Sequence, residues 1–516
     1  MKLLNFFYSS NRRISLGLGI IKFLKTILSL FVVMLSAKFF GTSEERDAWI
    51  LGGVIISVII QVLFGPINET FRAKYVHLRE EYSKEDLVKY TDALITLVLL
   101  VAVIFSFFLF FTPNIFAQAF APGFSKEQQV VLLLMIKFLV PSLLIIEVTD
   151  IWSSMLNAYN SFYLPDIFSF FTILLNVVIL IFLAPIIGIY SLVISSYISS
   201  ILLLVIVYRQ LYLKFAYRFK VLWPKWSLVK PFILFSVPFY INYIFSQTDI
   251  VIEKALSSKM SQGSISILDY AKKFSDLPIN MLIGVITTVL TPVLALAYVK
   301  KEIVNMVDET QRYFRMISLV IIPLTAVFMI LPHEIVTLVL LRGAFKAENV
   351  EPISSILRWY GLGIFITGIY IVYSQILIAQ KKIHLLTYII IGAYTLKIIF
   401  NVSLFRVFNL LTFPISWVTT QFIISSLMVY FGVVEQRQRL IKELILFYII
   451  LLLILGVNYS LYLSIQDYFS GTFGIIILVF LICISILIFE IILIFLFKIE
   501  ERKFVSKLFL PNGKKN

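Results

Sequence analysis

The sequence predicts an all-α polytopic membrane protein with 14 transmembrane helices. Sixty per cent of its 516 residues are hydrophobic and only 14% are charged, whereas charged residues make up about 25% of an ordinary soluble chain. Crossing the hydrocarbon core takes roughly 20 apolar residues, and stretches of that length recur along the chain. These features exclude a soluble fold and leave no room for a sizeable soluble domain.

The predicted spans follow one another along the whole chain, separated by short polar loops. They cover residues 14–39, 48–70, 90–112, 129–156, 163–184, 187–208, 231–255, 275–298, 316–341, 354–379, 385–404, 413–433, 443–463 and 472–497. The basic N-terminus could begin a signal peptide, but the apolar run from Ile14 to Phe40 exceeds an h-region of roughly 7 to 15 residues. The first span is therefore retained as a helix. Each later span is an apolar run between polar residues.

The Lys and Arg residues between the spans predict the orientation. With the N-terminus inside, the cytoplasmic segments hold 29 of the 44 Lys and Arg residues. The positive-inside rule then predicts a multi-pass protein with both termini in the cytoplasm, as expected for an inner-membrane protein. The net charge of +15 is spread over many short loops, which favours anionic phospholipids over nucleic acid as the partner.

The longest of these loops, residues 209–230, mixes cations with aromatic side chains. Its aromatic residues are Tyr212, Phe215, Tyr217, Phe219, Trp223 and Trp226. This composition is typical of a segment lying in the membrane interface. A solvated linker is the alternative.

An internal repeat predicts how the spans are grouped. Gly41 to Asp47 recurs loosely as Gly263 to Asp269, an offset of 222 residues, and Pro122 to Phe124 recurs as Gly343 to Phe345, an offset of 221. Leu156-Asn-Ala158 and Leu377-Ile-Ala379 share the offset of 221. Six spans separate the equivalent points, so the two halves are expected to be parallel repeats.

The repeat predicts three parts: a six-helix bundle over residues 1–215, a second six-helix bundle over 216–438, and two further helices with a cytoplasmic tail over 439–516. Two such bundles are expected to enclose a cavity, and rocking one against the other would give alternating access. This architecture favours a transporter over an enzyme, so no catalytic residues are expected.

Cations inside the predicted spans are candidate binding groups, because each costs roughly 2.5 to 3.5 kcal/mol to insert and tends to face a cavity or a partner. Lys22 and Lys25 share one face of the first span, roughly 12 to 17 Å from its inner end. They either bind an anion in the cavity or extend to the headgroups. Lys137 and Arg358 are separated by the repeat offset of 221, so they are expected to face either a shared axis or the outer headgroups.

Lys272 and Lys273 stand at the outer start of the eighth span. One is explained by interfacial anchoring, and the other is expected to line the mouth of the cavity. The in-span cations have no matching set of acids nearby, so the cavity is predicted to be net positive. Such a cavity suits a phosphate-bearing substrate.

Acidic residues within spans have two interpretations each. Asp249 and Lys397 fall at similar predicted depth, where an ion pair would be either a structural lock or a coupling site whose cation is replaced by an ammonium. Glu147 and Asp150 are either proton-linked or paired with cytoplasmic cations, and Glu490 has no obvious partner in the sequence. The three histidines are far apart and Cys483 is the only cysteine, so no metal site is expected. No nucleotide-binding motif is present, so ATP is not expected to drive transport directly. No cofactor is expected.

Several segments, in order over most of the first twelve spans, resemble the MurJ (MviN) family of lipid-linked peptidoglycan precursor flippases. They are Phe40-Gly41 to Trp49, Ala121 to Phe124, Leu156 to Pro165, Gly263 to Pro278 and Arg342 to Phe345. The resemblance implies membership of the superfamily of multidrug, oligosaccharide-lipid and polysaccharide exporters. The expected count of fourteen helices also resembles the helix count of this family.

The resemblance implies a V-shaped cavity between two bundles, with cationic residues that bind pyrophosphate and a groove for the polyprenyl tail at helices 13 and 14. Lys273 stands where the family has an Arg. The chain lacks the family's Arg residues in the second span, where it reads Ile59 to Pro66. Some members place sodium ligands in the eleventh span, where this chain has Lys397 and Asn401.

The sequence thus favours a flippase that moves an undecaprenyl-pyrophosphate-linked peptidoglycan precursor, lipid II, to the outer leaflet, in contact with the cell-wall synthesis machinery. One alternative is a flippase for a capsular or exopolysaccharide repeat unit. A polyprenyl-dependent glycosyltransferase is disfavoured because the outer loops are short. A proton-coupled drug exporter would need a cavity dominated by acids.

Overall fold

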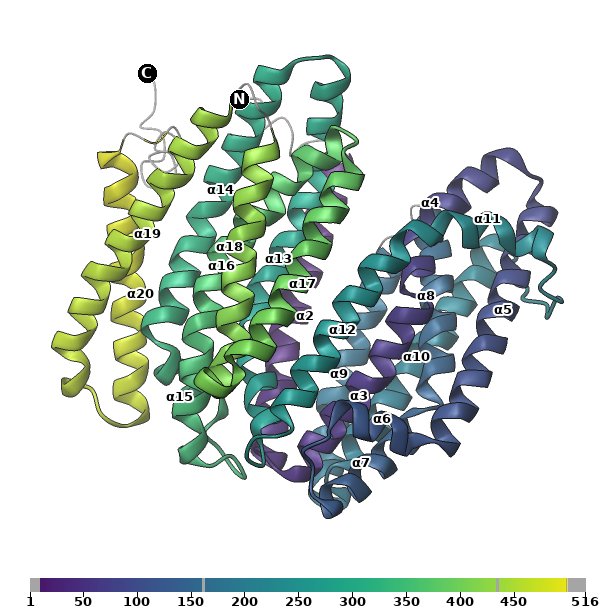
Figure 1. Ribbon diagram of the computed structural model, residues 1–516, viewed down its shortest axis with the longest axis horizontal. Helices are drawn as coiled ribbons and strands as arrows, with labels where there is room; N and C mark the ends of the chain where they lie inside the picture. Colours follow the sequence, from purple (N-terminus) through teal and green to yellow (C-terminus); the bar gives the residue numbers. More distant parts are fainter. Residues whose placement is uncertain (1–9, 160–162, 433–435, 498, 500–516) are drawn as a thin grey trace. The chain divides into compact units, whose positions relative to one another are not determined.

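The computed structural model describes residues 10–159, 163–432, 436–497 and 499. Within these ranges every regular element is an α- or 3-10 helix (Figure 1). The prediction of an all-α chain is confirmed. The described helices group into two compact units, one of residues 1–266 with 342–345 and one of residues 267–341 with 346–516.

The first unit contains eleven of the described α-helices, which begin with α2 and end with α12. They are α2 (Ser10–Phe40), α3 (Glu44–Leu63), α4 (Gly65–Glu81), α5 (Lys84–Phe111), α6 (Pro113–Phe120), α7 (Lys126–Leu139), α8 (Ser142–Ala158), α9 (Tyr163–Ile187), α10 (Tyr190–Phe215), α11 (Trp226–Ser236) and α12 (Tyr240–Ser257). Close pairs include α2 with α9, α9 with α10, and α3 with α7.

The second unit contains the remaining long helices. They are α13 (Ser264–Val299), whose first turn belongs to the first unit, α14 (Ile303–Ile330), α15 (Pro332–Leu340), α16 (Val350–Ala379), α17 (Ile383–Phe408), α18 (Thr412–Gly432), α19 (Arg437–Ile465) and α20 (Gly471–Leu496). Helix α16 packs between α14 and α18, and both α19 and α20 pack on α14.

Unit boundaries and predicted domain boundaries differ. Helices α11 and α12, expected in the second bundle, pack on α3, α4 and α5 of the first unit. Helices α19 and α20, expected as a separate pair, belong to the second unit. The parallel repeat therefore remains a prediction, and it does not coincide with the compact units.

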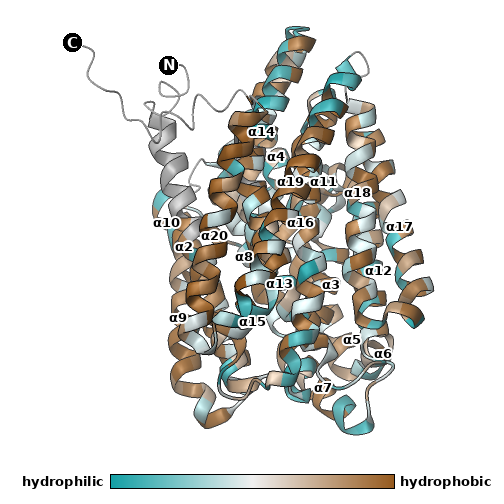
Figure 2. Ribbon diagram, turned by 90° about the vertical axis from the view of Figure 1, so that its left-hand side faces the viewer, coloured by the Kyte–Doolittle hydropathy of each residue, from teal (hydrophilic) through white to brown (hydrophobic). Residues whose placement is uncertain are grey.

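The described residues contain ten helical segments long and apolar enough to cross a membrane, or eleven if the bent pair α7 and α8 is one span. Hydrophobic residues run along nearly the full length of α9 and α20 (Figure 2). The chain is therefore a multi-pass membrane protein. The count of fourteen spans remains a prediction.

Proline breaks divide several predicted spans into two helices each. The predicted span 129–156 bends by 43° between α7 and α8, where Pro141 lies. The span 48–70 divides at Phe64 before Gly65-Pro66, and 231–255 divides at a 3-10 turn containing Pro238. Proline lacks the N–H that an uninterrupted helix needs, which explains each break.

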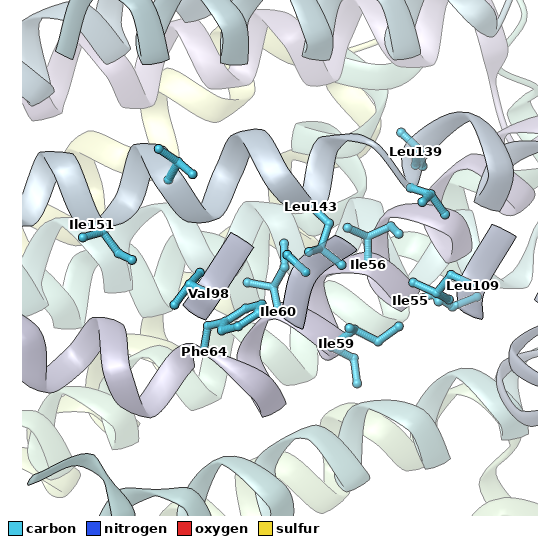
Figure 3. Close-up of a cluster of buried hydrophobic side chains, with 14 of the residues drawn as sticks. Ile55, Ile56, Ile59, Ile60, Phe64, Val98, Leu109, Leu139, Leu143 and Ile151 are labelled. Carbon is cyan, nitrogen blue, oxygen red and sulfur yellow. The ribbon is translucent and has the colours of Figure 1, made fainter. Parts of the chain in front are cut away.

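The core of the first unit forms where α3, α5, α7 and α8 meet. Figure 3 shows aliphatic side chains of α3 beside Leu139 and Leu143 of α7 and α8. Gly52 allows this approach, because a Cβ there would lie 3.1 Å from the Leu139 side chain and 3.3 Å from Met135 Cβ. Close packing through small residues is the usual way that membrane helices associate.

Candidate functional site

A buried cluster in the first unit surrounds the N-terminal end of α3. Ser43 caps this helix, since its side chain accepts a hydrogen bond from the Arg46 N–H. The next residue, Asp47, is only 1% exposed and points its carboxylate at the start of α13. Together, Arg46, Asp47, Gly263 and Ser266 form what we call the Asp47 cluster.

The Asp47 carboxylate accepts three hydrogen bonds. The backbone N–H groups of Gly263 and Ser266 donate to its two oxygens, each at 2.8 Å, and the Ser266 hydroxyl donates as well. The first N–H groups of a helix have no partner within the helix. Asp47 therefore caps α13 from a distant part of the chain and places a negative charge at the positive end of the helix dipole.

Arg46 completes the cluster from the other side. Its side chain is fully buried, donating from Nε to Ser36 Oγ at 3.2 Å and from Nη1 to the Ser266 carbonyl at 3.4 Å. A buried guanidinium is stable only when its donors have partners and a carboxylate lies nearby. The cluster therefore ties α2 and α3 to residues 263–266.

Two glycine turns pack beside this cluster. Gly41 and Gly343 both have positive φ, and the N–H of Ala344 donates to the Lys38 carbonyl at 2.8 Å. A Cβ on Gly343 would collide with the Lys38 backbone. Three segments predicted as repeats and as family motifs thus meet in one place. They are residues 41–47, 263–266 and 342–345. The sequence places Asp47 in the repeat but does not predict that it caps α13, because the Gly263 and Ser266 donors lie more than 200 residues away.

The predicted cations are divided between the two units. Lys22, Lys25 and Lys137 belong to the first unit, and Lys273 and Arg358 to the second. The side chain of Lys22 lies outside the described residues. Lys25 is half-buried on α2, and its carbonyl accepts a hydrogen bond from Ser29 Oγ.

Lys137 and Lys273 have contrasting surroundings. Lys137 is exposed at the end of α7, with its Nζ 5.5 Å from the centre of the Phe110 ring and beside the exposed apolar residue Phe138. The Nζ of Lys273 lies 3.0 Å from an Asp269 carboxylate oxygen, and the Lys273 side chain is 40% exposed. Their anion-binding roles remain predictions.

Arg358 is exposed on α16, close enough to Tyr462 of α19 to act on it electrostatically. Tyr462 donates a hydrogen bond of 2.6 Å to Glu334 of α15. This part of the second unit therefore brings a cation, a carboxylate and a phenol together. The prediction that Arg358 faces either a shared axis or the outer headgroups remains a prediction.

The expected pairing of Asp249 with Lys397 and Asn401 joins residues of different units. Asp249 and Glu253 are both buried on α12, and Glu253 forms a 2.9 Å ion pair with the adjacent Lys254. Lys397 and Asn401 are buried on α17. The structural or coupling role of this set remains a prediction.

Glu147 is a second fully buried carboxyl group of the first unit. Asn68 on α4 donates to its Oε2 at 3.3 Å, and its Oε1 has no hydrogen-bond partner among the described residues. Asp150, one turn further along α8, is exposed. Neither residue forms an ion pair with a cytoplasmic cation in the part of the chain that the structure describes.

Within the described ranges, no group of three or more His, Cys, Asp or Glu side chains is placed to hold a metal ion. The polar features of the molecule are instead buried capping contacts and scattered cations. Such groups can bind and position a charged substrate.

The fold of the chain is that of a known class of polytopic membrane proteins. It is similar to a solved structure described as a lipid II flippase MurJ in an inward closed conformation, with a TM-score of 0.78 and 23% identity, covering 93% of this chain and 99% of the other. It is also similar to an inward-facing multidrug resistance MATE transporter of the MOP superfamily, with a TM-score of 0.64 and 14% identity, covering 82% and 98%.

The family follows from the sequence comparisons. The family model "Lipid II flippase MurJ" matches residues 36–484, so the chain belongs to this family. A probable lipid II flippase MurJ of Buchnera aphidicola subsp. Baizongia pistaciae is 23% identical, covering 68% of this chain and 69% of the relative. A probable MurJ of Thermotoga maritima is 22% identical, covering 73% and 75%. The family predicted from the sequence motifs is confirmed.

Proposed function

We propose that the chain translocates lipid II from the inner to the outer leaflet of the bacterial inner membrane. The observation that carries this proposal is the MurJ family match over residues 36–484. The chain is accordingly a transporter of peptidoglycan biosynthesis and not an enzyme. The capsular or exopolysaccharide alternative is not favoured, because the matched relatives carry the lipid II flippase name.

The proposed mechanism is alternating access without covalent chemistry. Lys25 and Lys273 are proposed to neutralise the pyrophosphate, with Lys22, Lys137 and Arg358 as further candidate cations. Lys25 is half-buried and Lys273 is 40% exposed, so both retain solvent access for a charged ligand. Amines are suitable counter-charges for phosphate oxygens. The Asp249, Lys397 and Asn401 set is proposed to lock helices structurally.

The proposed topology has fourteen spans with both termini in the cytoplasm. Its support is the excess of Lys and Arg in alternate loops. Anionic phospholipids are proposed to contact these loops, and the cell-wall synthesis machinery is a proposed partner on the outer side. A cysteine introduced at either terminus should react with a membrane-impermeant maleimide only after the cells are opened.

The Asp47 cluster is proposed to hold two distant chain segments rigidly within the first unit. Residues 342–345 belong to the first unit, although the chain on both sides of them belongs to the second. Residues 263–266 likewise lead directly into α13. The chain passes between the units at these two short segments. Buried hydrogen bonds to Asp47 hold residues 263–266, and the Ala344 N–H to Lys38 carbonyl bond holds residues 342–345.

Complementation of a bacterium depleted of its own lipid II flippase tests the proposed function. The parent gene should restore growth. A Lys25→Ala, Lys273→Ala double variant should not, and Lys25→Arg, Lys273→Arg should do so in part because the charges remain. Lys346→Ala, which changes an exposed lysine of another loop, is the matched control.

Membrane levels of all variants must be equal, as measured by immunoblotting of isolated membranes. Failure of the well-expressed parent to rescue growth would contradict lipid II as the substrate. Full rescue by the double alanine variant would contradict the role of the two lysines.

A further inference from the structure

The segment that joins α10 to α11 is irregular in backbone but firmly attached. Helix α10 ends at Phe215, its C-cap residue Ala216 adopts the left-handed conformation with φ of 51°, and α11 begins at Trp226. Both flanking helices belong to apolar segments of membrane-crossing length. Residues 216–225, which we call the linker, are therefore held at a membrane surface by the spans at both ends.

A buried carboxylate fixes the conformation of the linker. Asp92 of α5 is fully buried and accepts hydrogen bonds from the Tyr217 hydroxyl and, at 3.1 Å, from the Lys220 backbone N–H. Burial, with the neighbouring Asp92 carboxylate, raises the pKa of Tyr217, so its hydroxyl stays protonated and keeps donating. Thr96, one turn further along α5, accepts from the Leu222 N–H at 3.3 Å.

The side chains of the linker and of Trp226, the first residue of α11, divide into a buried group and an exposed group. Tyr217 is only 3% exposed, and Phe219 packs edge-on against Trp152 of α8. In contrast, Val221 and Trp223 are each 76% exposed, and Trp226 is 57% exposed. The buried members attach the linker to the first unit, and the exposed members form an apolar ridge next to the ends of two spans.

The segment that carries this ridge has charges of a single sign. Residues 209–230 contain six cations and no Asp or Glu. All six cations are exposed, and they are Arg209, Lys214, Arg218, Lys220, Lys225 and Lys230. Indole rings prefer the headgroup level of a bilayer, and clustered Lys and Arg beside a span attract anionic lipids, each contributing about 1 kcal/mol.

We propose that Trp223, Trp226 and the surrounding cations form a preformed binding surface for anionic phospholipid headgroups, held in place by Asp92. The three linker hydrogen bonds to Asp92 and Thr96 order the surface before lipid arrives. Lipid binding then requires little further loss of conformational entropy. This surface is separate from the transported lipid, and Asp92 acts as a positioning residue through the linker.

Tryptophan quenching by brominated phospholipids tests the surface without any transport assay. The full chain is reconstituted in vesicles that contain either brominated phosphatidylglycerol or, at equal mole fraction, brominated phosphatidylcholine. The linker signal is the difference between the parent and a Trp223→Phe, Trp226→Phe variant. We expect brominated phosphatidylglycerol to quench this signal about twofold more strongly, because the cations concentrate anionic lipid beside the indoles.

Matched charge variants separate a local surface from the overall charge. Lys214→Gln, Lys225→Gln should bring the quenching ratio towards one, whereas Lys300→Gln, Lys382→Gln, which removes the same charge from exposed positions elsewhere, should leave it unchanged. Equal quenching by both lipids in the parent would overturn the anionic selectivity. The absence of quenching by either lipid would overturn the membrane contact itself.

Asp92→Asn and Thr96→Val test the positioning. Asn at position 92 keeps one acceptor oxygen for two donors, and Val at position 96 keeps the shape but removes the acceptor. Both should lower the quenching ratio while the first unit stays folded, as judged by an unchanged midpoint of thermal unfolding. If both variants stay folded and both leave the quenching ratio unchanged, the lipid surface does not depend on Asp92.

Discussion

Two fully buried carboxyl groups of the first unit have opposite surroundings. Asp47 accepts three hydrogen bonds, two of them from helix N-terminal backbone groups, with Arg46 beside it. Glu147 accepts one hydrogen bond from the Asn68 amide and has one oxygen without a partner among the described residues. Equal burial therefore does not mean equal function.

The difference separates a carboxylate whose negative charge the fold requires from one whose contacts do not require that charge. Asp47 satisfies donors that nothing else would satisfy, so its charge is part of the fold. The contacts of Glu147 would fit an amide as well as a carboxyl group. Isosteric amide substitutions at the two positions therefore form a direct comparison, because each keeps the shape, removes the negative charge and replaces one acceptor oxygen with an NH₂ donor.

The largest effect is expected from Asp47→Asn. The new NH₂ group would face a backbone N–H donor, and Arg46 would lose its neighbouring negative charge. Removing one partner of a buried charge pair typically costs about 3 to 5 kcal/mol. The free energy of unfolding in detergent micelles, measured by denaturant titration, should fall by an amount in this range, and an unchanged value would contradict the capping role of Asp47.

Ser266→Ala should have a smaller effect at the same cluster. It removes the hydroxyl donor but leaves both backbone N–H donors on Asp47. Hydrogen bonds to charged groups contribute about 1.5 to 3 kcal/mol, and the same titration should show a loss at the lower end of that range. A loss as large as that of Asp47→Asn would mean that the Ser266 hydroxyl, and not the backbone cap, accounts for the stability that the cluster contributes.

Asn68→Ala should cost less again. The substitution removes the hydrogen bond that the Asn68 amide donates to Glu147, and the net contribution of a neutral hydrogen bond is about 1 kcal/mol. Thermal unfolding of the purified variant should show a small decrease in the midpoint. Thr149→Ala on α8, which breaks a local side-chain bond to the Ile145 carbonyl, is a suitable control.

Glu147→Gln should have the smallest effect. The amide preserves the shape of the side chain and can still accept from Asn68, so the change in unfolding free energy should stay within about 0.5 kcal/mol. A loss comparable to that of Asp47→Asn would show that Glu147 is a structural charge. The comparison between the two carboxyl groups would then fail.

The sequence was sufficient for the class of fold and for the family. Long apolar runs are a direct consequence of bilayer thickness, and the Gly41 to Trp49 and Gly263 to Pro278 segments carried the family resemblance. The helix breaks at Pro141 and Gly65-Pro66 interrupt spans that hydropathy had joined. Hydropathy averages over a window and does not register a single missing N–H group.

The partners of buried charges could not be predicted from the sequence. Asp47 meets Ser266 across 219 residues, and Asp92 meets Tyr217 across 125. In both cases only the tertiary structure brings donor and acceptor together. The composition of the loop 209–230 predicts an interfacial segment, but its attachment through Asp92 and Thr96 has no sequence signal.

The most direct test of the central claim is reconstituted transport. The purified chain would be placed in vesicles containing fluorescent lipid II, and a membrane-impermeant reductant would report the fraction of lipid II that is exposed on the outer surface over time. The account predicts that the parent equilibrates lipid II between leaflets faster than protein-free vesicles do, and that Lys25→Ala, Lys273→Ala reduces this rate. Equal rates in vesicles with and without the folded parent would contradict the proposal that this chain is a lipid II flippase.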